Sequence, residues 1–134
     1  MNAGGTKHKG MTLIETLVVV MITSIMLAVS LTFYFTAQTD SQTKECQANM
    51  QSIANAEQQY YYKSSPHAYT TVMSNLTPEI PADPKCPSGG TYTVTISDGT
   101  ATAQNGQTVP AGGIVISCST SGHGKYAPGV DTPQ

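Results

Sequence analysis

One long apolar run near the N-terminus constrains this chain more than any other feature. Residues 17–35 are apolar except for four small hydroxyl side chains, at Thr23, Ser24, Ser30 and Thr32. As a helix, at about 1.5 Å per residue, this run extends about 28 Å, which is close to the thickness of one bilayer core. The run therefore predicts a membrane-spanning helix. The rest of the chain is rich in Thr, Ser, Gln, Gly and Pro.

Charge is distributed unevenly around this run. Residues 1–10 carry Lys7 and Lys9 and no acid, whereas the remainder of the chain has more acidic than basic residues. A short basic lead before an apolar run is typical of a signal peptide, or of an anchor whose basic end stays in the cytoplasm. A secretory signal has a shorter apolar region that ends at a cleavage site of small residues. Here the apolar run continues into helix-compatible sequence, which favours a retained anchor.

A carboxylate, that of Glu15, lies next to the start of the apolar run. A charged residue within a membrane span costs roughly 2.5–3.5 kcal/mol on insertion scales, so it needs a partner or a purpose there. The alternative is that Glu15 lies close enough to the membrane interface to stay hydrated. The residue alone leaves both interpretations open.

The segment around Glu15, KGMTLIETLVVVMI at residues 9–22, resembles the class III signal of type IV prepilins and type II secretion pseudopilins. It combines a Lys-Gly pair, an apolar run with Thr, and a Glu five residues after the Gly. The resemblance implies that a membrane-embedded prepilin peptidase cleaves between Gly10 and Met11 and N-methylates Met11. The chain departs from the family pattern in having Met11 instead of the usual Phe, and in having no Pro before Pro66.

The resemblance also implies a role for Glu15. Its carboxylate would pair with the Met11 amine of the next subunit, which neutralises two costly charges and sets the axial register of packing. The implied protein is a structural subunit, single-pass in the bacterial inner membrane with its C-terminal head outside the cytoplasm. It would then assemble with copies of itself and with other pilins or pseudopilins into a periplasmic or extracellular filament.

Three functions are compatible with these features. The expected one is a pseudopilin of a type II secretion system. A subunit of a type IV or competence pilus carries the same signal and is the first alternative. An ordinary single-pass membrane protein with a small ligand-binding periplasmic domain is the second alternative, and it would lack the cleavage that creates a Met11 N-terminus.

The long helix is predicted to continue beyond the apolar run, because residues 37–63 contain no Pro or Gly. One apolar stripe follows helical spacing there, interrupted by Glu57: Cys46, Met50, Ile53 and Tyr60. This half of the helix should pack its stripe on the rest of the chain. The expected organisation is a leader (1–10), a transmembrane and filament-core helix (11–36), an amphipathic continuation (37–63) and a small β-rich head (64–134).

The predicted head begins with a Pro-rich connecting loop, residues 64–91, that has room for one short turn. Residues 92–97 alternate as a half-buried strand, and Asp98-Gly99 predicts a turn from which residues 100–103 pair back. A second turn is expected at Asn105-Gly106, a last strand at 114–118, and a surface tail from Ser119. The predicted fold class is α+β, with a long N-terminal α-helix packed on a small antiparallel sheet, the lollipop arrangement of pilins.

Three cysteines occur, at Cys46, Cys86 and Cys118. The compartment beyond the membrane is oxidising, so one disulfide and one spare thiol are expected. Cys86 and Cys118 are the candidates, because they flank the strand segment and closing that interval would stabilise the head by roughly 3–4 kcal/mol. The sequence around them also resembles small bacterial pseudopilin-type proteins. Cys46 is expected to be a buried free thiol, although connectivity cannot be deduced from sequence.

A zinc site is the alternative use of these cysteines. Cys86, Cys118 and His123 provide three ligands of suitable type, but the sequence shows no Cys-x-x-Cys pair and no evident fourth ligand. We therefore expect no metal and no cofactor.

Catalytic and nucleic-acid functions have little support in the sequence. His67 and His123 lie in Pro- and Gly-rich loops without a nucleophile motif, so the chain is not expected to be an enzyme. With six Lys, no Arg and a net charge of −2, it offers no basic patch for a nucleic acid. Three carboxylates in turns are interpreted as solvated groups and not as a calcium cluster: Glu79, Asp83 and Asp98.

Overall fold

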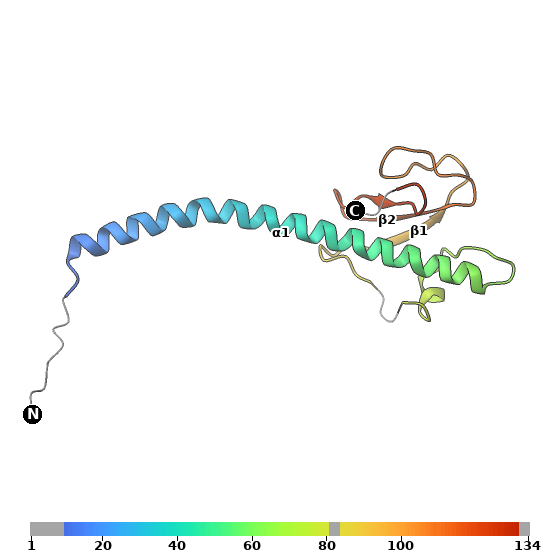
Figure 1. Cartoon of the computed structure of the whole chain (residues 1–134), viewed down its shortest axis with the longest axis horizontal. Helices are drawn as coiled ribbons and strands as arrows, with labels where there is room; N and C mark the ends of the chain where they lie inside the picture. The colour runs from blue at the N-terminus through green and yellow to red at the C-terminus, as the bar shows by residue number, and fades with distance from the viewer. Residues whose placement is uncertain (1–9, 81–83, 132–134) are drawn as a thin grey trace, which may run out of the picture. The chain divides into compact units, whose positions relative to one another are not determined.

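The computed structural model describes residues 10–80 and 84–131. The chain divides into an N-terminal part, residues 1–38, and a C-terminal part, residues 39–134. One helix, α1 (Leu13–Lys63), runs through both parts (Figure 1). The C-terminal part adds a 3-10 turn, η1 (Met73–Leu76), and three strands, β1 (Tyr92–Ile96), β2 (Ile114–Cys118) and β3 (Lys125–Tyr126). Of the predicted leader, all but Gly10 lies outside the described residues.

A capping interaction explains why α1 begins at Leu13. The backbone N–H of Glu15 donates to the Thr12 hydroxyl at 3.4 Å, and Thr12 and Glu15 have the spacing of a capping box. Glu15 is the acidic residue of the first turn, where the positive end of the helix dipole favours a carboxylate. The hydroxyl and the carboxylate together stabilise the start of the helix.

The hydroxyl side chains of the apolar run are satisfied within the helix itself. Each donates to a backbone carbonyl three or four residues earlier, at distances from 2.8 to 3.0 Å. Such bonds remove the need for water or another partner, so these side chains can lie in apolar surroundings at little cost. The residues concerned are Thr23, Ser24, Ser30 and Thr32.

The core of the C-terminal part forms between α1 and the sheet, which lie side by side (Figure 1). Met50 and Ile53 of α1 are fully buried and share one apolar cluster with Ile114 and Ile116 of β2. Cys46 is also fully buried, whereas Tyr60 packs at the edge of the same cluster. The predicted amphipathic stripe is thereby confirmed.

The sheet is antiparallel, with the strand order β1-β2-β3. Val94 of β1 is opposite Ile116 of β2, and Ile116 is opposite Tyr126 of β3. The side chains at Val94 and Ile116 are both buried, so this register directs one face of the sheet toward the apolar cluster. A long N-terminal helix and a small antiparallel sheet confirm the predicted α+β class.

The predicted pairing of residues 100–103 with residues 92–97 is wrong. β1 pairs with β2 along its whole length, and Thr102 instead forms an isolated bridge with Thr108 across the turn at Asn105-Gly106. At the Asp98 turn, the Asp98 carboxylate accepts hydrogen bonds from the backbone N–H and the hydroxyl of Thr100. β2 carries the apolar sequence Ile-Val-Ile, so pairing it with β1 buries more apolar surface than residues 100–103 could.

The predicted surface tail is also wrong in part, because residues 125–131 belong to the folded structure. β3 extends the sheet, and Ala127 is fully buried. The Asp131 carboxylate accepts hydrogen bonds from the backbone N–H groups of Gln104, Asn105 and Ala127, at 2.9–3.1 Å. This carboxylate therefore holds the tail against the loop that precedes β2.

Glu57 is a buried acid within the apolar stripe. One carboxylate oxygen accepts a hydrogen bond from the backbone N–H of Thr70 at 3.1 Å, and the other has no hydrogen-bond partner among the described residues. Burial raises the pKa of Glu57 above its usual 4.5, and the Thr70 N–H opposes this only in part. The folded state thus binds a proton more readily than the unfolded chain does.

This raised pKa predicts a pH-dependent stability that Glu57→Gln should remove. The contribution of Glu57 to stability is fully present below its unfolded pKa and is lost as pH rises through the folded pKa. Glu57→Gln keeps the acceptor for Thr70 without the charge, so it should stabilise the fold at pH 8 by about 1 kcal/mol and have little effect at pH 4. Denaturant unfolding of the full chain in detergent micelles, followed by circular dichroism, measures this difference.

The exposed Glu45 of the same helix provides the matched control. Glu45→Gln should change stability by a similar small amount at both pH values. The same pH dependence in wild type and in Glu57→Gln would contradict the assignment to Glu57.

Candidate functional site

The predicted cleavage site lies in an open stretch just before α1. Gly10 and Met11 are exposed, and a side chain added at Gly10 would meet no atom within 4 Å. The Gly10–Met11 bond is therefore not covered by any described residue of the chain. A glycine here is not required by the fold, because nothing crowds the position.

Glu15 lies on the surface of the first turn of α1. Among the described residues, the structure forms no ion pair with its carboxylate. Met11 precedes Glu15 by four residues and lies just outside the N-terminal end of α1. One chain thus carries a potential N-terminal amine and a carboxylate close together at the same end of the helix.

The N-terminal part presents an apolar surface that nothing in that part covers. Every large apolar side chain between Met11 and Phe35 is from 50% to 79% exposed. The most apolar 18-residue stretch of α1 has a mean hydropathy of 2.3, so the helix is long and apolar enough to cross a membrane. Exposed apolar surface of this extent indicates a membrane or a partner surface.

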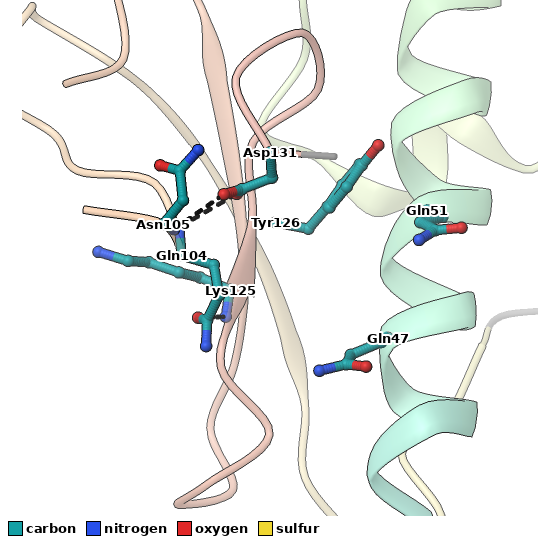
Figure 2. A pocket seen from close by; sticks show the side chains of 7 residues that line it. All are labelled: Gln47, Gln51, Gln104, Asn105, Lys125, Tyr126 and Asp131. Carbon is teal, nitrogen blue, oxygen red and sulfur yellow. Dashed lines mark hydrogen bonds between the residues drawn. The ribbon is translucent and has the colours of Figure 1, made fainter. Parts of the chain in front are cut away.

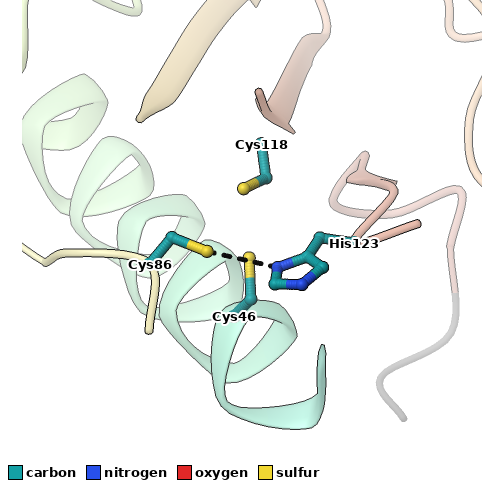
Figure 3. Close-up of side chains that lie close together, drawn as sticks. All are labelled: Cys46, Cys86, Cys118 and His123. Atoms are coloured by element: carbon teal, nitrogen blue, oxygen red, sulfur yellow. Dashed lines mark hydrogen bonds between the residues drawn. The ribbon is translucent and has the colours of Figure 1, made fainter. Parts of the chain in front are cut away.

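A second candidate site lies within the C-terminal part, where the three cysteines meet His123. Figure 3 shows the four side chains directed toward one another. One ligand atom from each residue, the Sγ atoms of Cys46, Cys86 and Cys118 and a ring nitrogen of His123, lies within 4.8 Å of all the others. Cys46 comes from α1, Cys86 from the loop before β1, Cys118 from the end of β2, and His123 from the turn before β3.

Hydrogen bonds fix the orientation of the His123 ring in this Cys/His cluster. Its Nδ1 atom is 3.2 Å from the Cys86 Sγ, and its Nε2 atom is 3.4 Å from the Ser88 hydroxyl oxygen. That hydroxyl donates its own hydrogen to Gln42 Oε1 at 3.1 Å. With its hydrogen donated to Gln42, the Ser88 hydroxyl oxygen can accept from Nε2–H. In that tautomer the lone pair of Nδ1 faces the Cys86 sulfur.

The thiols of the cluster differ in acidity because their surroundings differ. Burial raises the pKa of Cys46 to about 12, and the neighbouring cysteines add to this effect. Burial also acts to raise the pKa of Cys86, but the backbone N–H groups of Ser88 and Gly90 donate to its sulfur and lower the pKa to about 6.

The structure brings together the three residues of the predicted zinc alternative, Cys86, Cys118 and His123, and adds Cys46 to them. Sequence reasoning missed Cys46 as a fourth member, although three cysteines and one histidine are a complete tetrahedral ligand set. All three cysteines are free thiols in the structure. The Cys86–Cys118 disulfide stays a prediction.

Beside α1 lies a polar pocket of about 310 Å³ (Figure 2). Its two charged side chains are already hydrogen-bonded: Asp131 accepts three backbone hydrogen bonds, and Lys125 donates to the Thr102 hydroxyl. The other lining groups are Gln47, Gln51, Gln104, Asn105 and Tyr126.

The remaining candidate groups are separate from one another. Glu79 forms an ion pair with Lys63 at 2.6 Å, and Asp98 is bound to Thr100. Asp83 lies outside the described residues. His67 stacks on Tyr61 and places its Nδ1 atom 2.8 Å from the Tyr61 carbonyl oxygen.

Comparison with known proteins identifies the N-terminal site. Residues 5–31 match the family model of the prokaryotic N-terminal methylation motif, which is the class III prepilin-type signal of type IV pilins and pseudopilins. The match covers about a fifth of the chain and includes Gly10, Met11 and Glu15. No curated protein and no solved structure matches the chain. The predicted resemblance is confirmed: this chain carries a prepilin-type N-terminal signal.

Proposed function

We propose that this chain is a structural, non-catalytic prepilin-type subunit that prepilin peptidase processes at Gly10 and that then polymerises into a helical filament. The observation that carries the proposal is the methylation motif at residues 5–31, which extends from the basic lead into the exposed apolar part of α1. The apolar helix alone is not sufficient evidence, because a signal peptide or any membrane anchor also has one. The motif adds a specific cleavage point and a carboxylate at Glu15.

The first stage of the proposed function is anchoring in the inner membrane. The apolar surface from Met11 to Phe35 suits the hydrocarbon core, and the hydroxyl groups of the run are bonded to the helix itself. The basic lead with Lys7 and Lys9 stays on the cytoplasmic side, which places the C-terminal part outside the cytoplasm. The methylation motif and the apolar helix are consistent with this location.

The second stage is assembly, in which the same apolar surface packs against other subunits. Burying one large aliphatic side chain contributes about 1.5–3 kcal/mol where water is the alternative, so a bundle of such helices stabilises a filament outside the bilayer. Inside the bilayer, lipid covers these side chains equally well. Transfer from membrane to filament therefore exchanges one apolar environment for another. Helix packing and charge pairing, and not the hydrophobic effect, then make the filament more stable than the separate subunits in the membrane.

Charge pairing is the specific element of this assembly. Cleavage after Gly10 creates an amine at Met11, and Glu15 supplies a carboxylate that has no ion-pair partner among the described residues. A pair between the Met11 amine of one subunit and the Glu15 carboxylate of its neighbour neutralises both charges in the apolar core. Only one axial offset between neighbouring helices allows this pairing.

We favour a pseudopilin of type II secretion over a pilus subunit, because the described C-terminal part has only three short strands beside α1. A pseudopilus remains in the cell envelope, whereas a pilus extends from the cell. Detection of the chain in envelope fractions and its absence from sheared surface filaments would support the pseudopilin. Recovery from sheared filaments would instead favour the type IV or competence pilus.

Gly10→Val should abolish processing, because a β-branched side chain does not fit where the peptidase accepts glycine. The fold itself should be unaffected, since a side chain at Gly10 meets open space. Co-expression with a prepilin peptidase, followed by a gel-shift assay and N-terminal sequencing, measures cleavage. Wild type should begin at Met11, and normal cleavage of Gly10→Val would exclude the prepilin assignment.

Glu15→Val should leave the chain cleaved and inserted but block its assembly. Removing a charge makes the span more apolar, so insertion is not impaired. In the filament each Met11 amine would lose its partner, and breaking a buried pair costs about 3–5 kcal/mol at each contact. We expect at least a tenfold fall in cross-linked multimers relative to membrane monomer, measured by chemical cross-linking in intact cells.

Glu45→Val is the matched control for this experiment. Glu45 is an exposed acid of the same helix that lies beyond the apolar run. This variant should assemble as wild type does. Wild-type levels of multimer from Glu15→Val would mean that Glu15 is only a hydrated residue at the membrane interface.

A further inference from the structure

Among the residues that the structure describes, the Cys/His cluster is the group of converging metal-ligating side chains that the proposed filament function does not use. Its four members come from four separate segments of the C-terminal part, yet their ligand atoms all lie within 4.8 Å of one another. Cys46 is fully buried, Cys86 is 4% exposed and His123 is 6% exposed. Cys118 is partly exposed, so three sulfur atoms and one imidazole nitrogen converge at a site that is mostly, not fully, closed to solvent (Figure 3).

We propose that Cys46, Cys86, Cys118 and His123 bind one structural Zn²⁺ ion. Three thiolates and one histidine form a ligand set typical of structural zinc sites, which are tetrahedral and closed. Because protein ligands fill all four coordination positions, the site has no open position for water or substrate. The ion would therefore cross-link α1, the loop before β1, the end of β2 and the turn before β3.

The spacing of the ligand atoms fits this coordination. Zinc holds sulfur at about 2.3 Å and imidazole nitrogen at about 2.0–2.1 Å, which places neighbouring ligand atoms about 3.5–3.8 Å apart in a tetrahedron. The distance from Cys86 Sγ to His123 Nδ1 is 3.2 Å, and no pair in the cluster exceeds 4.8 Å. Shifts of about 1 Å or less bring the four atoms to tetrahedral positions.

The surroundings of the ligands also match a metal site. A ligating histidine typically donates its other ring N–H to an oxygen that fixes its orientation. Here Ser88 fulfils this role at Nε2, and Gln42 in turn holds the Ser88 hydroxyl. The backbone N–H groups of Ser88 and Gly90 also donate to the sulfur of Cys86, so these hydrogen bonds help to hold that ligand in place.

A single disulfide explains the cluster less completely. Three cysteines cannot all pair within one chain, so any disulfide leaves a third thiol and His123 beside it. The backbone at Gly90 also packs closely against the cluster. A side chain added there would lie 2.9 Å from the Cys118 sulfur and closer still to Thr120. Zinc uses all four side chains, and coordination of the sulfurs would compete with their oxidation.

Metal and thiol analysis of the wild-type chain provides the main test. The full chain would be purified from membranes in detergent without chelator, its zinc content measured by elemental analysis, and its thiols alkylated with and without a chelator. We expect about one zinc per chain and three thiols that react fully only after chelation. Little or no zinc, together with a cross-linked Cys86–Cys118 peptide pair in the folded protein, would overturn the proposal.

Cobalt substitution tests the geometry independently of any variant. Zinc-stripped wild type titrated with Co²⁺ alone should give the intense visible absorption of a tetrahedral site and a thiolate-to-cobalt charge-transfer band in the near ultraviolet. The weak spectrum of six-coordinate cobalt would count against the proposed ligand set. This measurement does not require that a cysteine variant folds.

His123→Gln and His67→Gln form a matched pair of variants. His67 lies outside the cluster, bonded to the Tyr61 carbonyl, so His67→Gln should retain zinc as wild type does. His123→Gln should lose zinc to a competing chelator at least tenfold more readily. Ser88→Ala keeps all four ligands and should weaken zinc binding by about 10- to 100-fold. Equal zinc retention by His123→Gln and wild type would refute the site.

Discussion

The C-terminal part depends on one buried stripe of α1. Met50 and Ile53 are fully buried against Ile114 and Ile116, and they supply the helical side of the apolar cluster. The sheet has two strands of five residues and one of two, too little to be stable in water by itself. The C-terminal half of α1 is therefore required for this part to fold, since without its stripe the strands would have no apolar surface to pack on.

The same helix meets two different environments along its length. Beyond residue 39 its buried face is covered by the chain itself, whereas from Met11 to Phe35 its large apolar side chains are at least half exposed. Hydroxyl groups bonded to their own helix make that first stretch compatible with lipid or with other apolar helices. The methylation motif at residues 5–31 overlaps this stretch.

The buried stripe and the Cys/His cluster are connected, because Cys46 belongs to both. By packing on the sheet, α1 brings Cys46 to the loop that carries Cys86 and to the end of β2 that carries Cys118. A chain of this size buries a modest core, and small domains commonly gain stability from a metal or a disulfide. The proposed zinc ion would add a cross-link between segments that already share the apolar cluster.

Local sequence alone determined the prepilin-type signal, the apolar run and the amphipathic stripe of α1. These features depend on residue type and on spacing along one helix, so no distant part of the chain changes them. Only the tertiary structure decided that β1 pairs with β2, that residues 125–131 join the fold, and that Cys46 lies with Cys86, Cys118 and His123. Strand partners and convergent ligands depend on contacts between residues far apart in sequence, and the burial of apolar surface across the whole C-terminal part selects among them.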